Sequence, residues 1–570
     1  IPGQDYPGER LKEAWIKLLF SQFHDILPGS NVPLSVDYQS GKIQEVFEIT
    51  SMIQSNTYRS IASSINTSGS FKDRVADDQH VDAWAFGAGA GRDANTGDLS
   101  SVGYTRNSGN CMVVFNPLSW KQQELVRATL WDYLPGSSTR NMEDLSFIII
   151  SSTGEAFPVQ YLGPEGSSWA HRYIDMVFPA EVNAFGYNTY LITEGKEKGT
   201  NQPVICTKTT DSGYSLQNNY LDVYIDPELG SISKLLNKTS KTNYAVSGNP
   251  CASLEYLMEE GGDAWTIGNI QEKIYPLKLK SIEKGLGGPY LASVTSTYSI
   301  NDSEVKITYL LGYQKSYIEL KVDMDWKEMG SVTTGTPMLR IMFPFPFVNS
   351  RASYEIPYGS IERDQYQGEE VVALRWANVG GILRDSQQPA GCLVLNDCKY
   401  GHSLDNNVLK VTLIRSSFYP DPYPEMGKHT VRLALMPHLQ EITTKDFMKL
   451  ASEFNHSLKV VNTDIHDGGL PAVTENLISI QPDNVILTSI KKAEDDDNLI
   501  LRLIEAEGIA VSAQVSLNPE VFGKIKKIFE TDLLERAVSG SVMINTGNSF
   551  SVDIPAYGIT TVKIALKKNK

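Results

Sequence analysis

The sequence predicts a multidomain α+β protein in which an N-terminal helical bundle is followed by mostly antiparallel β-sandwich domains. Three observations support this prediction. Apolar residues recur at spacings of three and four near the N-terminus, whereas later segments such as "YIELKVDMDW" alternate between apolar and polar residues and are separated by Gly, Pro, Asn and Asp turns. At 570 residues the chain is several times longer than a typical domain, so we expect three or more units.

The helical bundle is expected within residues 1–67. A first helix is predicted over residues 11–27, because its apolar residues form one buried face, and Pro28 and Gly29 end it. On that helix His24 would lie about 180° from Trp15, outside the buried face. A second helix is predicted from about residue 36 to residue 65. The two buried faces are predicted to contain Leu11, Trp15, Leu18, Leu19, Phe23 and Ile26, and Ile43, Val46, Phe47, Ile53, Ile61 and Ile65.

Four further regions are predicted. Residues 68–108 are rich in Gly, Asn, Asp and Ser and lack the apolar surface that offsets ordering entropy, so we interpret them as a linker or long loop. A small β domain is expected at 109–200, a large β-sandwich at 201–445 and a C-terminal β domain at 446–570. The last two boundaries lie near the polar "TEGKEKGTNQP" and the short helical piece "TKDFMKLASEF".

Charge and composition exclude several partners. The net charge of −16 opposes binding to nucleic acid or an anionic membrane surface, and a neutral ligand fits better. No stretch approaches the roughly 18 apolar residues of a membrane-spanning helix. The five cysteines are scattered and form no CxxC pair, which favours a reducing compartment. We expect a cytoplasmic location, with a vacuolar or lysosomal-type compartment as the alternative.

The pair His24–Asp25 is the main candidate for chemistry. A neutral imidazole is a good zinc ligand, and a neighbouring carboxylate accepts hydrogen bonds from sugar hydroxyls. On residue types alone, a solvated pair at a helix end is the simpler interpretation. Zinc needs three or four protein ligands, and the other seven histidines form no H-x-H or H-E-x-x-H pattern.

Several segments, in order, resemble glycoside hydrolase family 38, the retaining α-mannosidases, and especially its cytosolic, vacuolar and microbial branch. Phe23 supports that branch, because Golgi and lysosomal members have a histidine there. The similar segments are "YPGERLKEAWIKLLFSQFHDILPGS" (6–30), "VVFNPLSWKQQELV" (113–126), "LDVYIDPELGSISKLLNK" (221–238), "DAWTIG" (263–268), "YEIPYGSIERDQ" (354–365), "ALRWANV" (373–379) and "LNDCKYGHSLDNNVLKVTLIRSSFYPDP" (395–422).

The resemblance implies roles for four residues. His24 would be a zinc ligand, with cobalt as the alternative metal, and Asp25 would contact mannose hydroxyls. In "DAWTIG", Asp263 and Trp265 would contact the sugar through a carboxylate and a stacked ring, although a tryptophan is more often a core residue. The expected reaction is hydrolysis of terminal α-mannosyl residues of oligomannose glycans with retention, through a nucleophilic carboxylate and an acid/base carboxylate.

The resemblance also implies a partner. Family members carry both catalytic carboxylates and the other zinc ligands on an amino-terminal α/β barrel, so we expect no catalytic residue in this chain and no activity from the chain alone. A missing barrel portion or subunit and a mannose-containing oligosaccharide are therefore the predicted partners, and a homo-oligomer is left open. The alternative function is a non-catalytic carbohydrate-binding or scaffold protein, because β-sandwiches frequently bind sugars without chemistry.

Overall fold

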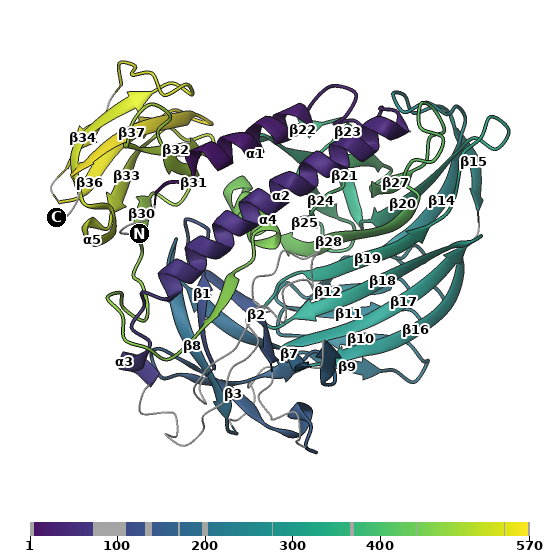
Figure 1. Ribbon diagram of the computed structural model, residues 1–570. Coiled ribbons are helices and arrows are strands. Elements are labelled where there is room, and N and C mark those ends of the chain that lie inside the picture. The colour runs from purple at the N-terminus through teal and green to yellow at the C-terminus, as the bar shows by residue number, and fades with distance from the viewer. Residues whose placement is uncertain are drawn as a thin grey trace. The chain divides into compact units, whose positions relative to one another are not determined.

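The computed structural model (Figure 1) describes residues 5–71, 110–131, 139–168, 171–196, 203–275, 277–364, 370–439, 442–540, 542–545 and 547–567. The chain divides into two compact units, each built from separate stretches of sequence. Unit 1 comprises Ile1–Ser63, Gly199–Tyr354 and Glu362–Gln440, and unit 2 comprises Ser64–Lys198, Glu355–Ile361 and Glu441–Lys570. Within the described residues, no helix combines the length and apolar character needed to cross a bilayer.

Unit 1 begins with two helices, α1 (Gly8–Phe20) and α2 (Pro33–Ala62). Pro33 starts α2, where its fixed φ suits the first turn and its missing N–H has no partner to lose. Arg10 contacts Met52, Lys17 contacts Glu45 and Phe20 contacts Tyr38. Because residue numbers rise along one helix as they fall along the other, the helices form an antiparallel hairpin.

The rest of unit 1 contains three antiparallel sheets. Their strand orders are β13-β12-β11-β10-β9, β15-β14-β20-β27-β26-β23 and β16-β17-β18-β19-β28-β25-β24-β21-β22. The strands are β9 (Ile205–Lys208), β10 (Tyr214–Gln217), β11 (Leu221–Ile225), β12 (Ile232–Asn237), β13 (Thr242–Asn243), β14 (Ser253–Glu259), β15 (Ile270–Tyr275), β16 (Lys278–Gly287), β17 (Leu291–Ile300), β18 (Ser303–Gly312), β19 (Ile318–Trp326), β20 (Thr336–Pro344), β21 (Phe347–Ile356), β22 (Gly359–Arg363), β23 (Val371–Val372), β24 (Trp376–Leu383), β25 (Pro389–Asn396), β26 (Gly401–Asp405), β27 (Val408–Arg415) and β28 (Gly427–Leu439).

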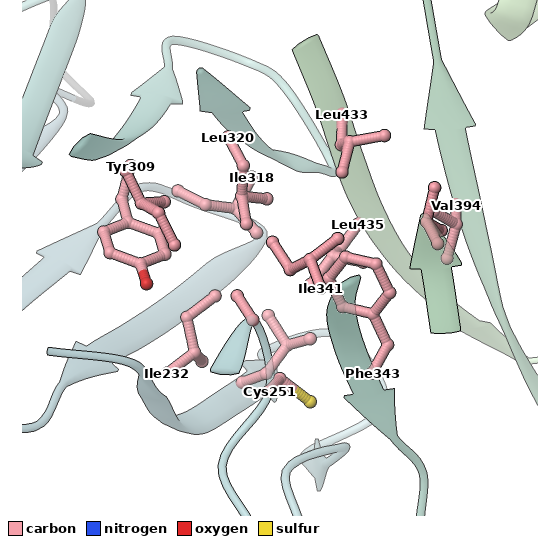
Figure 2. Close-up of a cluster of buried hydrophobic side chains, with 14 of the residues drawn as sticks. Ile232, Cys251, Tyr309, Ile318, Leu320, Ile341, Phe343, Val394, Leu433 and Leu435 are labelled. Atoms are coloured by element: carbon pink, nitrogen blue, oxygen red, sulfur yellow. The ribbon is translucent and has the colours of Figure 1, made fainter. Parts of the chain in front are cut away.

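One hydrophobic core joins these three sheets into a large sandwich. Strand β19 shows how the sequence produces it, since Ile318, Leu320 and the following alternate residues are buried while the charged residues between them lie on the other face. Figure 2 shows side chains from all three sheets meeting in this core, among them Ile232, Ile341 and Leu433. The predicted β-sandwich architecture is confirmed.

Unit 2 contains a small sandwich with sheets β29-β1-β8-β3-β4 and β2-β7-β5, and β6 pairs with β7. Met112, Phe147 and Phe178 are buried in its core, which also includes Val460 of β29. The elements are α3 (Ser68–Phe71), β1 (Asn110–Phe115), β2 (Gln122–Trp131), the 3₁₀ helix η3 (Met142–Asp144), β3 (Phe147–Ser151), β4 (Ala156–Pro158), β5 (Gln160–Tyr161), β6 (Gly166–Ser168), β7 (His171–Val182), β8 (Tyr187–Glu194), α4 (Thr444–Asn455) and β29 (Lys459–Thr463).

The C-terminal part of unit 2 is a second sandwich, with sheets β30-β33-β36-β35 and β31-β32-β37-β34 around their own core. Its elements are β30 (Ile478–Gln481), β31 (Val485–Lys492), β32 (Leu499–Glu505), β33 (Val511–Leu517), α5 (Pro519–Phe522), β34 (Lys524–Thr531), β35 (Met543–Ile544), β36 (Ser549–Ile554) and β37 (Ile559–Lys567). Most of the predicted linker at 68–108 lies outside the described residues, and the predicted domain boundaries stay a prediction.

Candidate functional site

The connection between α1 and α2, residues 21–32, carries His24 and Asp25. The prediction that the first helix continues to residue 27 is wrong, because α1 ends at Phe20. Beyond it the backbone forms consecutive turns, in which the N–H of Leu27 donates to the carbonyl of Phe23 and the N–H of Ser30 donates to the carbonyl of Asp25. The pair therefore lies at the tip of the hairpin, and the helical angle predicted for His24 does not apply.

His24 projects from this tip with 79% of its side chain exposed. Its Nε2 atom lies 3.7 Å from the Oδ2 atom of Asp25, and the centroid of its ring lies 4.2 Å from the centroid of the Phe23 ring. Asp25 is 42% exposed, and its Oδ1 atom is 3.5 Å from the hydroxyl of Ser30. Both side chains are available to an external ligand.

The described residues do not by themselves form a zinc site. His24 and Asp25 together supply two side chains, and nowhere in the described ranges do three or more His, Cys, Asp or Glu side chains gather around a metal-sized position. A structural or catalytic zinc ion needs three or four protein ligands. This pair is therefore at most a partial donor set.

The hairpin also carries many exposed apolar side chains, which together we call the hairpin face. The predicted buried faces are wrong for Trp15, Leu19, Phe23 and Phe47, each of which is more than half exposed. Ala14 is the buried residue of α1. Two helices are too few to cover all their apolar side chains. The hairpin face consists of Trp15, Ile16, Leu19, Phe20, Phe23, Leu27, Leu34, Val36, Tyr38, Phe47 and Met52.

Asp263 and Trp265 lie in the loop between β14 and β15. The Oδ1 atom of Asp263 accepts hydrogen bonds from the backbone N–H groups of Thr266 (2.7 Å) and Trp265 (2.9 Å), which closes a tight turn. The hydroxyl of Thr266 contacts the same carboxylate. The backbone N–H of Thr266 is the main reason that the pKa of Asp263 is lowered, so this group is a carboxylate at neutral pH.

Trp265 is not a core residue, since 54% of it is exposed. Its ring centroid lies 5.8 Å from that of Tyr419, and the two planes are inclined by 52°. Tyr419 belongs to the loop after β27 and is 61% exposed. The structure therefore brings a second aromatic ring to the predicted sugar contact.

A buried ion pair lies beneath this turn. Arg415, the last residue of β27, forms two hydrogen bonds of 2.7 Å with the carboxylate of Glu259, which is fully buried. The same guanidinium donates to the backbone carbonyls of Asp263 (3.0 Å) and Thr266 (2.7 Å). Sequence reasoning missed Arg415, Glu259 and Tyr419. Only the similarity of "LIRSSFYPDP" to the family pointed toward two of them.

Three family models match the chain, in the order expected for a single family. The alpha mannosidase middle domain matches residues 1–61, the glycosyl hydrolases family 38 C-terminal domain matches 216–423, and the family 38 C-terminal beta sandwich domain matches 484–562. The chain belongs to glycosyl hydrolase family 38. It corresponds to the middle and C-terminal domains of that family, and the hairpin tip with His24 and Asp25 lies inside the segment matched by the middle domain.

Curated relatives agree with this assignment. The alpha-mannosidase 2C1 of Homo sapiens is 22% identical over an alignment of 581 positions, which covers 99% of the family 38 chain and 46% of the relative. The alpha-mannosidase of Saccharomyces cerevisiae is 24% identical over an alignment of 580 positions, which covers 99% of this chain and 43% of the relative. The chain thus spans less than half the length of either protein.

Solved structures support the fold. The crystal structure of an alpha-mannosidase from Enterococcus faecalis V583 superposes with a TM-score of 0.74, covering 98% of the family 38 chain and 64% of that protein at 14% identity. A second Enterococcus faecalis protein of family 38 gives a TM-score of 0.73 at the same identity, with 98% and 66% covered. At this identity the similarity establishes the fold alone.

Proposed function

We propose that this chain is the C-terminal part of a zinc-dependent retaining α-mannosidase that removes terminal α-mannosyl residues from oligomannose glycans. The supporting observation is the exposed pair His24–Asp25 at the tip of a hairpin that matches the family's middle domain. The family match supports mannosides as substrates. The nucleophile and the acid/base belong to the part of the relatives' length that this chain does not cover.

His24 is proposed as one metal ligand and Asp25 as an acceptor for mannose hydroxyls. Because the described residues supply too few donors, we assign the remaining ligands to that same uncovered part. Zinc is the proposed metal and cobalt the alternative. Asp263 and Trp265 are proposed as further sugar contacts, since Trp265 is exposed beside a carboxylate whose Oδ2 atom has a single close donor in the described structure, the hydroxyl of Thr266.

The hairpin face is proposed to be covered by that remaining polypeptide, whether it is joined to this chain or is a separate subunit. Exposed apolar side chains gathered on one element mark interaction sites, and each buried Leu or Phe contributes about 1.5–3 kcal/mol. Burial of the hairpin face would bring the exposed imidazole of His24 to the edge of the new interface. The proposed location is the cytoplasm, with a vacuolar-type compartment as the alternative; that all five cysteines are free supports a reducing compartment.

The test is to express the 570-residue chain alone and together with the polypeptide encoded directly upstream, and to measure hydrolysis of p-nitrophenyl α-mannoside. We expect activity only in the combined preparation. His24→Ala should lower that activity by about 100-fold, since loss of a ligand weakens metal binding. His429→Ala, on β28 outside the proposed site, is the matched control and should retain activity.

Mannosidase activity in the purified chain alone would contradict this proposal, and so would full activity of His24→Ala. The exposed Trp265–Tyr419 pair favours one alternative, a carbohydrate-binding β-sandwich protein without catalysis. Glycan binding by a combined preparation that never hydrolyses mannosides would support that alternative.

A further inference from the structure

The turn that carries Trp265 is held more rigidly than an ordinary surface loop. The Asp263 carboxylate accepts two backbone hydrogen bonds within the turn, and the Arg415 guanidinium donates to two of the turn's backbone carbonyls. Two glycines, Gly262 and Gly268, let the backbone of this turn lie close to the Phe418 ring and to the carbonyl group of Glu260. A Cβ atom on Gly268 would lie 1.6 Å from the carbonyl oxygen of Glu260, and one on Gly262 would lie 2.0 Å from the ring of Phe418. A larger residue at position 268 would clash with the backbone, and one at position 262 would have to displace the Phe418 ring.

This support is costly for a surface feature. Forming the Arg415–Glu259 pair removes the Glu259 charge and most of the Arg415 side chain from water, a penalty that the ion pair offsets only with good geometry and further hydrogen bonds. Here the extra hydrogen bonds go to the backbone of the turn rather than to the core. What the arrangement holds in place is an exposed indole, which contributes little to folding. Preorganising an exposed aromatic side chain is a feature of binding surfaces.

We propose that Trp265 and Tyr419 form a two-ring platform that stacks against one pyranose unit of a neutral oligosaccharide, and that Arg415 and Glu259 are its positioning residues. The proposal rests on the proposed function in one respect, because it extends the sugar contact assigned to Trp265. It adds the second ring and the pair that holds the platform.

The chemistry of the platform selects the ligand class. A hexopyranose presents a face of C–H bonds that packs on an aromatic ring and a rim of hydroxyls that hydrogen-bond to carboxylates. Asp263 lies two residues from the indole and is ionised, so it is an acceptor beside the rings. The net charge of −16 opposes anionic ligands. In mannose the axial C–H bonds of C3 and C5 lie on one ring face, opposite the axial hydroxyl of C2, and supply the apolar contact for an aromatic ring.

The test uses the 570-residue chain labelled with 5-fluorotryptophan, with the Trp265 resonance assigned by its loss in Trp265→Phe. We expect titration with α-linked mannobiose to shift that resonance. Trp265→Ala and Tyr419→Ala should each weaken mannobiose binding by about 10-fold, which corresponds to about 1.4 kcal/mol. Tyr557→Ala, an equally exposed tyrosine of the C-terminal sandwich, is the matched control and should bind like the parent chain.

The positioning role has its own readout. Arg415→Lys keeps the charge but loses the forked pairing, and Glu259→Gln keeps the shape but loses the charge. Both should move or broaden the Trp265 resonance before any sugar is added and should weaken binding, while far-UV circular dichroism stays that of the parent chain. If the loop backbone alone positions the two rings, the Trp265 resonance and the mannobiose affinity will be unchanged in both variants. That result would overturn the positioning role.

The platform itself is overturned if mannobiose leaves the Trp265 resonance unmoved, or if Tyr557→Ala weakens binding as much as Tyr419→Ala does. These outcomes are separate from those of the proposed function. A combined preparation that binds mannobiose but hydrolyses nothing contradicts the mannosidase and leaves the platform intact. An active preparation whose Trp265 and Tyr419 variants bind and cleave normally contradicts the platform alone.

Discussion

His402 is a buried histidine in the core of the large sandwich. Its Nδ1 atom lies 3.2 Å from the carbonyl oxygen of Tyr400, and its Nε2 atom has no hydrogen-bond partner in the described structure. Burial lowers the pKa of His402 from 6.5 to about 4, so the folded protein holds the ring neutral. The unfolded chain takes up a proton below pH 6.5 that the folded chain accepts only near pH 4.

This difference predicts that unit 1 loses stability between pH 6.5 and pH 4, by about 3 kcal/mol in total. Stability rises with pH across this window because the unfolded state binds more protons. Urea unfolding at several pH values measures the slope, and His402→Gln should flatten it. His429→Gln, at a partly exposed histidine, is the control. Because the pKa of the buried His438 is also lowered by burial, part of the slope should remain, and an unchanged slope in His402→Gln would count against the prediction.

Glu505 is a second buried ionisable residue, in the C-terminal sandwich. Its carboxylate accepts hydrogen bonds from the side-chain amide of Asn484 and from the backbone N–H groups of four residues, Glu507, Gly508, Ile509 and Tyr557. Burial acts to raise the pKa of Glu505, but these donors outweigh it, led by that of Tyr557, and the pKa is lowered. The carboxylate thereby joins the end of β32 to the loop before β37.

Glu505→Gln should destabilise the C-terminal sandwich by about 2–3 kcal/mol, because the N–H groups of the new amide would face the N–H groups that now donate to the carboxylate. Since the pKa is lowered in the folded state, the wild-type contribution is present above about pH 4.5 and is lost on further acidification. Thermal unfolding at pH 7 and pH 4 measures both effects. The exposed Glu475 provides the control substitution, Glu475→Gln, and equal melting of the two variants would refute the role.

At the scale of elements, the helical hairpin shows what periodicity reveals and what it does not. The spacing of apolar residues correctly predicted two helices near the N-terminus. It also predicted that Trp15 and Leu19 would be buried, yet both are exposed. Periodicity identifies the apolar face of a helix, but it does not show which polypeptide segment packs against that face. The resemblance in "DAWTIG" pointed to Trp265 as a site residue, but it did not reveal the hydrogen bonds that Arg415, from a strand far along the chain, makes to the same turn.

The hairpin face can be tested with the triple substitution Trp15→Gln, Leu19→Gln, Phe23→Gln. In the 570-residue chain we expect a change in unfolding free energy within about 0.5 kcal/mol per site, because these side chains are exposed. The variant should fail to co-purify with the polypeptide encoded upstream, as measured by size-exclusion chromatography. Leu229→Gln, an exposed leucine of the large sandwich, should co-purify normally. Strong destabilisation of the triple variant by itself would show that this face packs on its own chain.

At the scale of the whole molecule, each unit is assembled from distant stretches of sequence. In unit 2, β1 lies between β8 and β29, and Cys111 pairs in register with Thr463. The segment after β29 also contacts this sheet. The hydroxyl group of Thr474 donates a hydrogen bond to the carbonyl of Tyr187 in β8 and accepts one from the backbone N–H of Tyr187. A cut at the predicted boundary of 446 would separate β29 from its sheet.

Truncation tests this interdependence. A chain ending at residue 440 lacks β29 and the buried residues Leu458 and Val460, so β1 should lose protection against amide hydrogen exchange. A chain ending at residue 476 keeps β29 and the contacts of Thr474 and should retain protection in β1, although it lacks the C-terminal sandwich. Equal protection in both truncated chains would show that the small sandwich does not depend on β29.

The sequence by itself determined the local features of this protein: helices near the N-terminus, alternating strands such as β19, the family, and the pair His24–Asp25 as a candidate site. These follow from side-chain periodicity, turn residues and motifs, which act over a few residues. Only the tertiary structure decided that the apolar stripe is uncovered, that β29 completes the sheet of β1, and that Arg415 and Tyr419 meet Trp265. These depend on pairings between residues far apart in the chain, which local patterns do not encode.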